Sequence, residues 1–213
     1  MENPVQEVYS AVVNGNASEV KEKVQAALDN GVEAETILNN GLIAAMKEVG
    51  QLFEDGEYFV PEMLISARAM QAGMSVLRPI LVDQDIKPVG KVVIGTVKGD
   101  LHDIGKNLVS MMLEGSGFQM IDIGTDVSPE KFLEAINEHK PDIVGMSALL
   151  TTTMMNIPKT ISYLAEQGVR NKIKIIIGGA PVSQKFADEI GADGFAPDAS
   201  QVAAVAKRLM GVA

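Results

Sequence analysis

KVVIGTVKGDLHDIGKNLVSMMLE, residues 91–114, sets the architecture of the second half of this chain. The apolar run at residues 91–97 predicts a buried β-strand, and residues 108–114 have the apolar spacing of a helix. The loop between them holds His102, one of only two histidines in the chain, with Asp100 two positions before it and a second aspartate directly after it. A histidine on a glycine-containing loop is placed to reach a ligand, and a neighbouring carboxylate can fix its tautomer, as metal-binding histidines require.

Apolar runs alternate with helical patterns through residues 91–213. The expected strands are residues 91–97, 119–123, 142–147, 174–177 and 192–195, and the expected helices are residues 104–116, 129–139, 153–167, 183–190 and 199–210. Strands that are apolar on both faces, with helices between them, are typical of a parallel sheet covered by helices on both sides. We therefore predict a flavodoxin-like, Rossmann-like domain of five parallel strands in the order 2-1-3-4-5.

Residues 1–82 have helical periodicity only. The apolar spacing predicts helices over residues 4–14, 18–30, 33–53 and 61–82, separated by glycine-containing turns. Four helices of this length predict an N-terminal four-helix bundle. The polar stretch at residues 83–90 predicts a linker, so we expect a helical domain at 1–82, a hinge at 83–90 and an α/β domain at 91–213.

Composition narrows the classes of partner and reaction. The 213-residue chain has a formal net charge of −10, which argues against a nucleic-acid backbone or an anionic membrane as partner, because both attract basic patches. It contains no cysteine, so disulfides, thiolate metal sites and a cysteine nucleophile are excluded. No secretory signal is visible, and no apolar run approaches the ~20 residues that span a bilayer, so we expect a cytoplasmic protein.

Three of the expected loops combine features that suit a ligand site. In a sheet of this order the loops after strands 1, 3 and 4 line one crevice at the carboxyl ends of the strands. The first loop carries Asp100 and His102, the second runs from Ser147 to Thr153 and mixes hydroxyls with apolar side chains, and the third carries two adjacent glycines. The loops after strands 2 and 5 lack this character.

The chemistry of these loops points to a metal. His102 can offer one neutral ring nitrogen to a metal while Asp100 accepts the proton on the other nitrogen, and a hydroxyl of the third-strand loop can hold Asp100 in turn. Gly105, Gly178 and Gly179 leave room where a bulky group passes close to the backbone. A metal held by a single histidine suggests an ion already bound in a macrocycle, because most bare ions take three or four protein ligands.

Each loop taken alone has a plainer interpretation. Asp100 or Asp103 could cap the following helix, His102 could be an exposed loop residue, the glycine pair could form only a tight turn, and the threonines could only start a helix. Nucleotide motifs fit poorly, since the glycine spacing is one residue too long for a P-loop and no GxGxxG follows the first strand. Ser147 also stands where a phospho-receiver needs an aspartate. The convergence of three loops at one crevice favours the ligand site.

These motifs resemble those of the corrinoid proteins of cobalamin-dependent methyltransferases, including the cobalamin-binding module of methionine synthase. DLHDIG at residues 100–105 matches the family's DxHxxG signature, SAL at residues 147–149 matches SxL, and Gly178-Gly179 matches GG. GEYFVPE at residues 56–62, followed by SARAM at residues 66–70, resembles the family's helical cap. The resemblance covers essentially the whole chain.

The resemblance implies cobalamin or a related corrinoid, bound base-off with its benzimidazole tail displaced from cobalt. His102 would be the lower cobalt ligand, and Asp100 and Thr153 would complete a hydrogen-bonded relay behind it. Thr153 stands where methionine synthase is expected to have a serine. The other implied cofactor-binding residues are Leu101, Asp103 and Ile104 in the signature, Gly105, Gly178 and Gly179 around the tail, Ser147, Leu149 and Thr151 in its slot, and Phe59, Met63 and Met70 in the cap.

The resemblance also implies a function that needs partners. A donor-specific methyltransferase would methylate Co(I) on this protein, an acceptor methyltransferase would pass the methyl group to a folate or a thiol, and a reductive activation protein would restore lost Co(I). The chain would then be a non-autonomous subunit, and its cap would shield the methyl group and move on the 83–90 hinge. A cobalamin-responsive regulator and a mutase-type cobalamin subunit are the alternatives. The acidic charge disfavours the first, and the four-helix cap disfavours the second.

Overall fold

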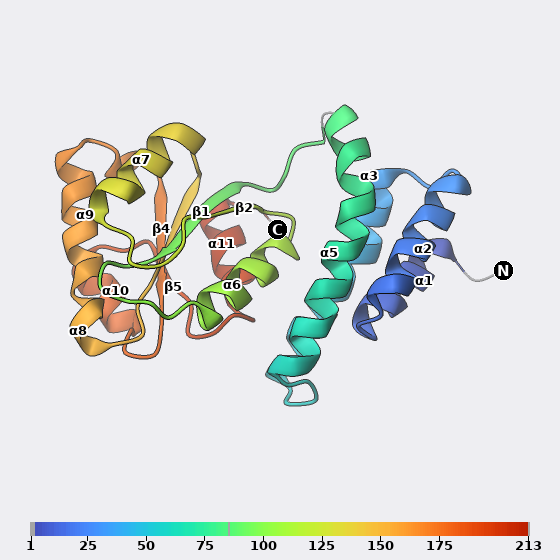
Figure 1. Ribbon diagram of the computed structural model, residues 1–213, viewed down its shortest axis with the longest axis horizontal. Coiled ribbons are helices and arrows are strands. Elements are labelled where there is room, and N and C mark those ends of the chain that lie inside the picture. The colour runs from blue at the N-terminus through green and yellow to red at the C-terminus, as the bar shows by residue number, and fades with distance from the viewer. Residues whose placement is uncertain (1–2, 85, 213) are drawn as a thin grey trace. The chain divides into compact units, whose positions relative to one another are not determined.

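The computed structural model describes residues 3–84 and 86–212 and divides into two compact units, with the chain passing from one to the other at Pro88 and Val89. A helical N-terminal region is followed by a five-stranded parallel sheet, which confirms the predicted fold class (Figure 1). The expected 83–90 linker includes this division, and its residue 85 lies outside the described residues. No helix in the described ranges has both the length and the apolar composition needed to cross a membrane.

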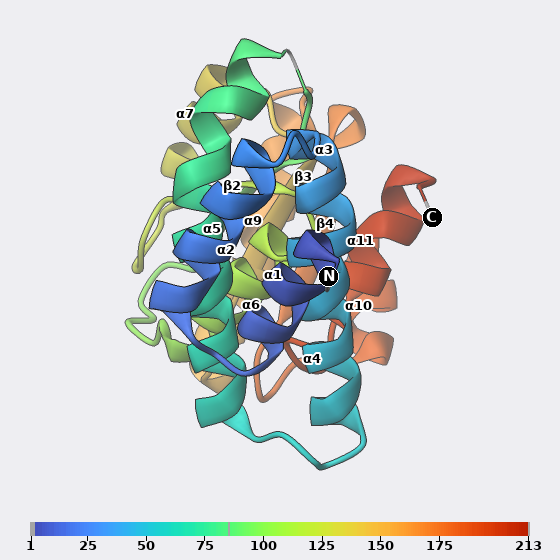
Figure 2. The same ribbon diagram turned by 90° about the vertical axis from the view of Figure 1, so that its right-hand side faces the viewer.

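The first unit is a bundle of helices. Its elements are α1 at Pro4–Val13, α2 at Ala17–Asp29, α3 at Ala34–Thr36, the π-helical η1 at Ile37–Ile43, α4 at Ala44–Glu54 and α5 at Val60–Asp83. Helical backbone angles continue through the junctions of α3, η1 and α4, so these three elements form the third of the four expected helices. Figure 2 shows α1, α2, α4 and α5 side by side; α1 contacts the other three, and α5 also contacts α2 and α4.

Short polar side chains define the helix ends of this bundle. The side chain of Asn3 accepts from the Val5 N–H at 3.1 Å at the start of α1, and that of Asn16 accepts from the Glu19 N–H at 3.3 Å at the start of α2. Each such cap stabilises a helix by about 1 kcal/mol. At the start of α5, the Glu62 carboxylate accepts from the Phe59 N–H at 3.0 Å. The bundle therefore begins three of its helices with side-chain bonds.

The second unit is an α/β domain. Its strands are β1 at Lys91–Thr96, β2 at Gln119–Asp122, β3 at Ile143–Ser147, β4 at Lys174–Gly178 and β5 at Gly194–Phe195. Its helices are α6 at Ile104–Glu114, α7 at Pro129–His139, α8 at Thr151–Met154, α9 at Asn156–Glu166, the 3-10 turn η2 at Arg170–Lys172, α10 at Gln184–Ile190 and α11 at Val202–Met210. All neighbouring strands pair in parallel, in the predicted order β2-β1-β3-β4-β5.

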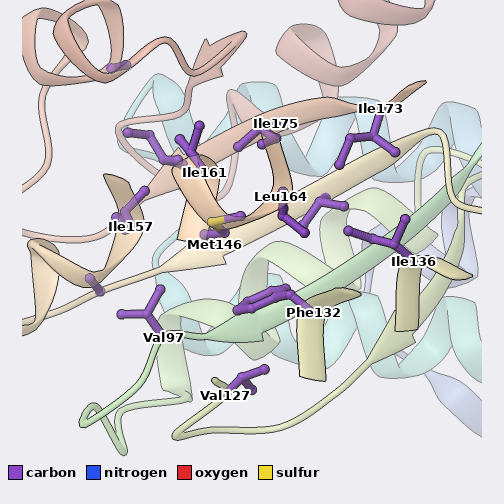
Figure 3. Packing of buried hydrophobic residues seen from close by; sticks show 14 of the residues in the cluster. Val97, Val127, Phe132, Ile136, Met146, Ile157, Ile161, Leu164, Ile173 and Ile175 are labelled. Atoms are coloured by element: carbon purple, nitrogen blue, oxygen red, sulfur yellow. The ribbon is translucent and has the colours of Figure 1, made fainter. Parts of the chain in front are cut away.

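Helices cover both faces of this sheet. α6 contacts α11 and α7 contacts α9, and Figure 1 shows the two pairs on opposite sides of the strands. On the α7 and α9 side, Phe132 and Leu164 pack against Met146 of β3 and Ile175 of β4 (Figure 3). Burying such a side chain contributes about 1.5–3 kcal/mol, so this core holds the strands that carry the site loops.

The helix expected over residues 153–167 is instead two helices, α8 and α9, which meet at Met155. Pro158 explains the break, because proline has no N–H to donate to the carbonyl four residues earlier, at Met154. The side chain of Asn156 turns away to donate to the Lys98 carbonyl at 2.7 Å. The short α8, which carries Thr153, is therefore oriented by its contacts with the first loop rather than by a continuous helix.

Candidate functional site

The carboxyl ends of β1, β3 and β4 bring the three expected loops together. The Val97 N–H donates to the Ser147 carbonyl at 3.0 Å, which joins the loop after β1 to the end of β3. The Ala148 N–H donates to the Gly178 carbonyl at 3.1 Å, which joins the loop after β3 to the end of β4. The sheet order thus gathers residues that are separated by about half of the domain's sequence.

Asp100 is the buried centre of this site, with no exposed surface. Its Oδ1 accepts from the ring Nδ1 of His102 at 2.7 Å and from the His102 backbone N–H at 3.0 Å. Its Oδ2 accepts from the Leu149 N–H at 2.8 Å and from the Thr153 hydroxyl at 2.6 Å. A buried carboxylate is tolerated when its lone pairs are satisfied in this way. The four bonds tie the first loop to the third-strand loop and to α8.

These contacts keep Asp100 ionised. Burial by itself raises the pKa of the Asp100 carboxyl, but the hydrogen bonds from Thr153, Leu149 and His102 outweigh it and hold the pKa well below its ordinary value. A carboxylate can only accept, so Nδ1 of His102 carries the shared proton. The other ring nitrogen, Nε2, is then left with its lone pair free for a ligand.

His102 presents that nitrogen at the surface. Its side chain is 51% exposed, and the Thr96 hydroxyl donates to its backbone carbonyl at 2.8 Å, which fixes the loop behind the ring. Across residues 3–84 and 86–212 no three His, Cys, Asp or Glu side chains cluster closely enough to hold a metal ion. A metal at His102 would therefore have one histidine ligand and would need further ligands of its own.

Exposed apolar side chains lie on the loops that carry His102 and its partners. Leu101 and Ile104 flank His102 in the sequence and are 73% and 80% exposed, and Leu149, whose N–H donates to Asp100, is also exposed. Leu150, the next residue of the third-strand loop, is exposed too and was not singled out from the sequence. Exposed apolar side chains on loops that meet at one polar group are typical of a ligand surface. They would suit the apolar face of a macrocycle whose metal His102 would reach.

The three expected glycines differ in their surroundings. At Gly105 an added Cβ would meet no atom within 4 Å, so nothing in the described protein requires a glycine there, and the open space fits a ligand. At Gly178 the Cβ would lie 3.3 Å from the Ala196 carbonyl oxygen. Gly179 has a φ of +124°, and its Cβ would lie 1.8 Å from the Ala148 oxygen, so the protein's own backbone requires that glycine.

Hydroxyl groups on α6 and on the third-strand loop are candidate partners for the polar tail of a ligand. Ser110 of α6 has a buried hydroxyl with no hydrogen-bond partner in the described part of the chain. An orphaned buried hydroxyl costs about 1–3 kcal/mol unless something bonds to it, and a ligand with polar groups could do so. Ser147 is half-buried and Thr151 is exposed, both on the third-strand loop. These hydroxyls are groups to which the polar tail of a corrinoid could bond.

The remaining expected residues lie in different settings. Asp103 is exposed, and its carbonyl accepts from the Asn107 N–H at 2.8 Å at the start of α6. In the helical unit Phe59 is exposed, as a cap contact requires. Met63 and Met70 are buried at helical spacing on α5 with Ser66, whose hydroxyl donates to the α1 carbonyl of Val13 at 3.1 Å. Core packing accounts for both methionines, so of the three cap residues only Phe59 offers its side chain to a ligand.

Sequence reasoning missed several groups that shape the site. The Leu149 N–H is one of four donors to Asp100, but a backbone donor leaves no mark in the sequence. Thr96 lies within the expected strand at residues 91–97, and nothing in the sequence indicated that its hydroxyl bonds to the His102 carbonyl. The loop after β2 was set aside, yet its Asp126 carboxylate accepts from the Gly99 N–H at 2.8 Å. The polar residues that follow that strand in the sequence were the signal that could have indicated this contact.

Comparison with known proteins identifies the family of this chain. Residues 90–206 match the family model of a B12 binding domain, and residues 5–78 match a second B12 binding domain model. The chain is 42% identical over 210 residues to dimethylamine corrinoid protein 3 of Methanosarcina acetivorans, covering 99% of this chain and 98% of that protein.

Solved structures are similar over nearly the whole chain. One is the methanol:cobalamin methyltransferase complex MtaBC from Methanosarcina barkeri, with a TM-score of 0.87 and 30% identity over 99% of this chain and 80% of that chain. Another is a cobalamin-binding protein from Desulfitobacterium hafniense DCB-2, with a TM-score of 0.80 and 32% identity over 96% and 98%. The fold and the matches define a two-domain B12-binding protein. Within that class, the chain belongs to the family of corrinoid proteins of methyltransferase systems.

Proposed function

We propose that this protein holds a corrinoid through His102 and carries methyl groups between two partner methyltransferases. The observation that carries the proposal is the bond from His102 Nδ1 to the buried Asp100 carboxylate at 2.7 Å, which leaves Nε2 free on a half-exposed ring. The relatives support the carrier role, because they are named as corrinoid proteins and one solved structure is a methyltransferase complex.

The residues of the site have separate tasks in this proposal. His102 would hold the cobalt through Nε2. Asp100 holds the proton at Nδ1 and raises the basicity of the ring, and Thr153 holds Asp100 by donating to Oδ2. Leu101, Ile104 and Leu149 would exclude water from the lower face. The corrinoid, when bound, supplies a cobalt that accepts and gives up a methyl group.

Partner enzymes would supply the donor and the acceptor. The compared proteins are named for dimethylamine and for methanol, so we expect a donor methyltransferase that acts on a small methylated amine or alcohol. The acceptor enzyme would deliver the methyl group to a folate or a thiol, and a reductive activation protein would restore inactive cofactor. Phe59 of the helical unit would be a contact for the cofactor, and residues 83–90 would be the hinge that lets this unit move for each partner.

Loss of His102 should abolish the nitrogen ligand without abolishing the fold. Wild-type protein labelled with 15N-histidine, incubated anaerobically with hydroxocobalamin and desalted, should retain corrinoid. After chemical reduction to Co(II), its EPR lines should each split into two because of one 15N ligand from histidine, whereas the unlabelled nitrogen of the tail base would split them into three. His102→Ala should lose the two-line splitting and retain at least roughly tenfold less corrinoid, because ligand loss in metal sites has effects of this size or larger. His139→Ala is the matched control, since His139 is the only other histidine.

Two results would contradict the proposal. One is histidine nitrogen splitting that persists in His102→Ala, and the other is a wild type that retains no corrinoid.

The carrier role is tested separately with a donor methyltransferase and a radiolabelled methyl donor. Label should join the corrinoid-loaded wild type and then pass to a thiol or folate when the acceptor enzyme is added. If the radiolabel is never transferred to the corrinoid protein, the carrier role is contradicted, but the evidence for corrinoid binding is not affected.

Substitutions at Gly105 should weaken corrinoid binding while sparing stability. A side chain there meets no protein atom, and alanine favours a helix over glycine by up to about 1 kcal/mol, so Gly105→Ala should unfold at the same or slightly higher urea concentration. Gly105→Leu should fold as well but retain about tenfold less corrinoid, equal to about 1.4 kcal/mol. If binding is unchanged across Gly, Ala and Leu, the cofactor does not pass this position.

A further inference from the structure

Asp126 has no role in the proposed function, but it makes hydrogen bonds to the loop that carries His102. Asp126 lies between β2 and α7, and its carboxylate accepts from the Gly99 N–H at 2.8 Å and from the Lys98 ammonium at 3.0 Å. Its own backbone N–H donates to the Asp100 carbonyl at 2.9 Å. Asp126 therefore bonds to three consecutive residues of the first loop, the last of which, Asp100, lies two positions before His102.

Asp126 adopts a backbone conformation that most residues avoid. Its φ is +54°, and Asp126 and Lys140 are the two non-glycine residues with a positive φ in the described ranges. Aspartate and asparagine tolerate this left-handed region better than other side chains, at a cost of about 1 kcal/mol or more. The conformation points the N–H and the carboxylate of Asp126 toward the same loop, so both bonds depend on it.

The anchor for Asp126 is the end of β1 itself. The Thr96 N–H donates to the Gly124 carbonyl at 3.0 Å, the Val127 N–H donates to the Thr96 carbonyl at 2.9 Å, and Val97 and Val127 form a parallel bridge. The segment before α7 is thus fixed along the strand that leads into the site. A carboxylate on a fixed segment can set where the first loop turns, and Asp100 follows that turn.

We propose that Asp126 is a positioning residue for the lower cobalt ligand, an inference that rests on the proposed function. By holding Gly99 and Asp100 it sets the direction of the Asp100 carboxylate, which in turn orients the ring of His102. Removing the carboxylate frees the start of the loop, so the ring samples orientations in which Nε2 does not reach cobalt. The loop after β2 therefore takes part in the site without contacting the cofactor.

The test compares three variants of the full chain loaded with hydroxocobalamin and reduced to Co(II). Asp126→Gly removes the carboxylate without strain and opens no core cavity, because the side chain is 42% exposed. Asp126→Asn keeps an oxygen for the Gly99 N–H and tolerates the same φ. Asp142→Gly is the matched control, since the Asp142 carboxylate accepts from the Lys91 N–H at 2.8 Å at the opposite end of β1. The protein is labelled with 15N-histidine, and the readout is the fraction of Co(II) whose EPR lines carry the two-line splitting of that histidine, with far-UV circular dichroism confirming the fold.

Asp126→Gly should lower the ratio of histidine-bound to unbound Co(II) by roughly tenfold, the lower end of the effect of groups that orient a metal ligand. Asp126→Asn and Asp142→Gly should match the wild type. A wild-type ratio in Asp126→Gly, or an equal loss in Asp126→Asn or Asp142→Gly, would overturn the positioning role. If the wild type itself shows no histidine nitrogen splitting, the proposed function fails, and this inference fails with it.

Discussion

Asp100→Asn should lower the free energy of unfolding by about 2–4 kcal/mol at neutral pH, although it changes only an oxygen into an NH2 group. Each carboxylate oxygen accepts from one backbone N–H, that of His102 on Oδ1 and that of Leu149 on Oδ2. The imidazole and the Thr153 hydroxyl can adapt by changing tautomer or rotating. The two backbone donors cannot, so either orientation of the new amide points its NH2 at a fixed N–H.

The measurement is urea unfolding of the corrinoid-free protein. Asp103→Asn is the matched control, because Asp103 lies three residues along the same loop and is exposed. We expect it to change the free energy of unfolding by no more than about 0.5 kcal/mol, as is usual for surface positions. Equal effects of the two substitutions would show that the buried carboxylate does not organise the loop.

The difference in stability between the wild type and Asp100→Asn should also depend on pH, in a direction that the pKa of Asp100 sets. The folded protein holds the pKa of Asp100 below its ordinary value, so the group stabilises the fold above the unfolded pKa of about 3.9 and loses that contribution as the pH falls. The difference in stability between wild type and Asp100→Asn should therefore be constant from pH 5 to 8 and shrink below about pH 4. A difference that grows on acidification would mean that Asp100 is protonated in the folded protein.

Much of the fold was predictable because it depends on periodicity. Alternation of apolar runs and helices gives a parallel sheet, and the common order of such sheets places the loops after β1, β3 and β4 at one edge. Asp100, His102 and Thr153 could therefore be assigned to one crevice from sequence, and the hydrogen bonds that join them are present. Position along the chain was enough for these residues, because each lies directly after a strand or on the loop that follows it.

Other features were not predictable because they depend on tertiary contacts. Met63 and Met70 have the apolar, flexible side chains that suit a cofactor, and only packing shows that they are buried on α5. The role of Asp126 was hidden as well, because its carboxylate bonds to the backbone N–H of Gly99 in another loop. The break between α8 and α9 is different, because Pro158 lies inside the expected helix and was a sequence signal for an interruption there.

Gly179→Ala should destabilise the protein by about 3–5 kcal/mol, from a strained backbone angle together with a steric overlap. Gly179 has a φ of +124°, which L residues rarely adopt, and the added Cβ would lie 1.8 Å from the Ala148 oxygen and 2.7 Å from its carbonyl carbon. Both are backbone atoms, so no side-chain rotation can relieve the overlap. Urea unfolding of the corrinoid-free protein measures the effect.

Gly178→Ala is the matched control at the neighbouring position. Its Cβ would lie 3.3 Å from the Ala196 oxygen, a tight contact that a small shift relieves, so we expect a loss of no more than about 1 kcal/mol. Similar losses in the two variants would mean that the loop after β4 yields easily and that Gly179 is not required by the backbone.

The overlap at Gly179 should also affect His102, the proposed metal ligand. Ala148 directly precedes Leu149, whose N–H donates to Asp100 at 2.8 Å, so pushing the Ala148 carbonyl aside moves one of the bonds that hold Asp100 against His102. Gly179→Ala should therefore lose stability and corrinoid retention together, whereas Gly105→Leu should lose retention alone. Unchanged corrinoid retention in Gly179→Ala, despite the stability loss, would show that the site is insulated from the loop after β4. Measuring both quantities in both variants separates a glycine that the protein backbone requires from one that leaves room for the cofactor.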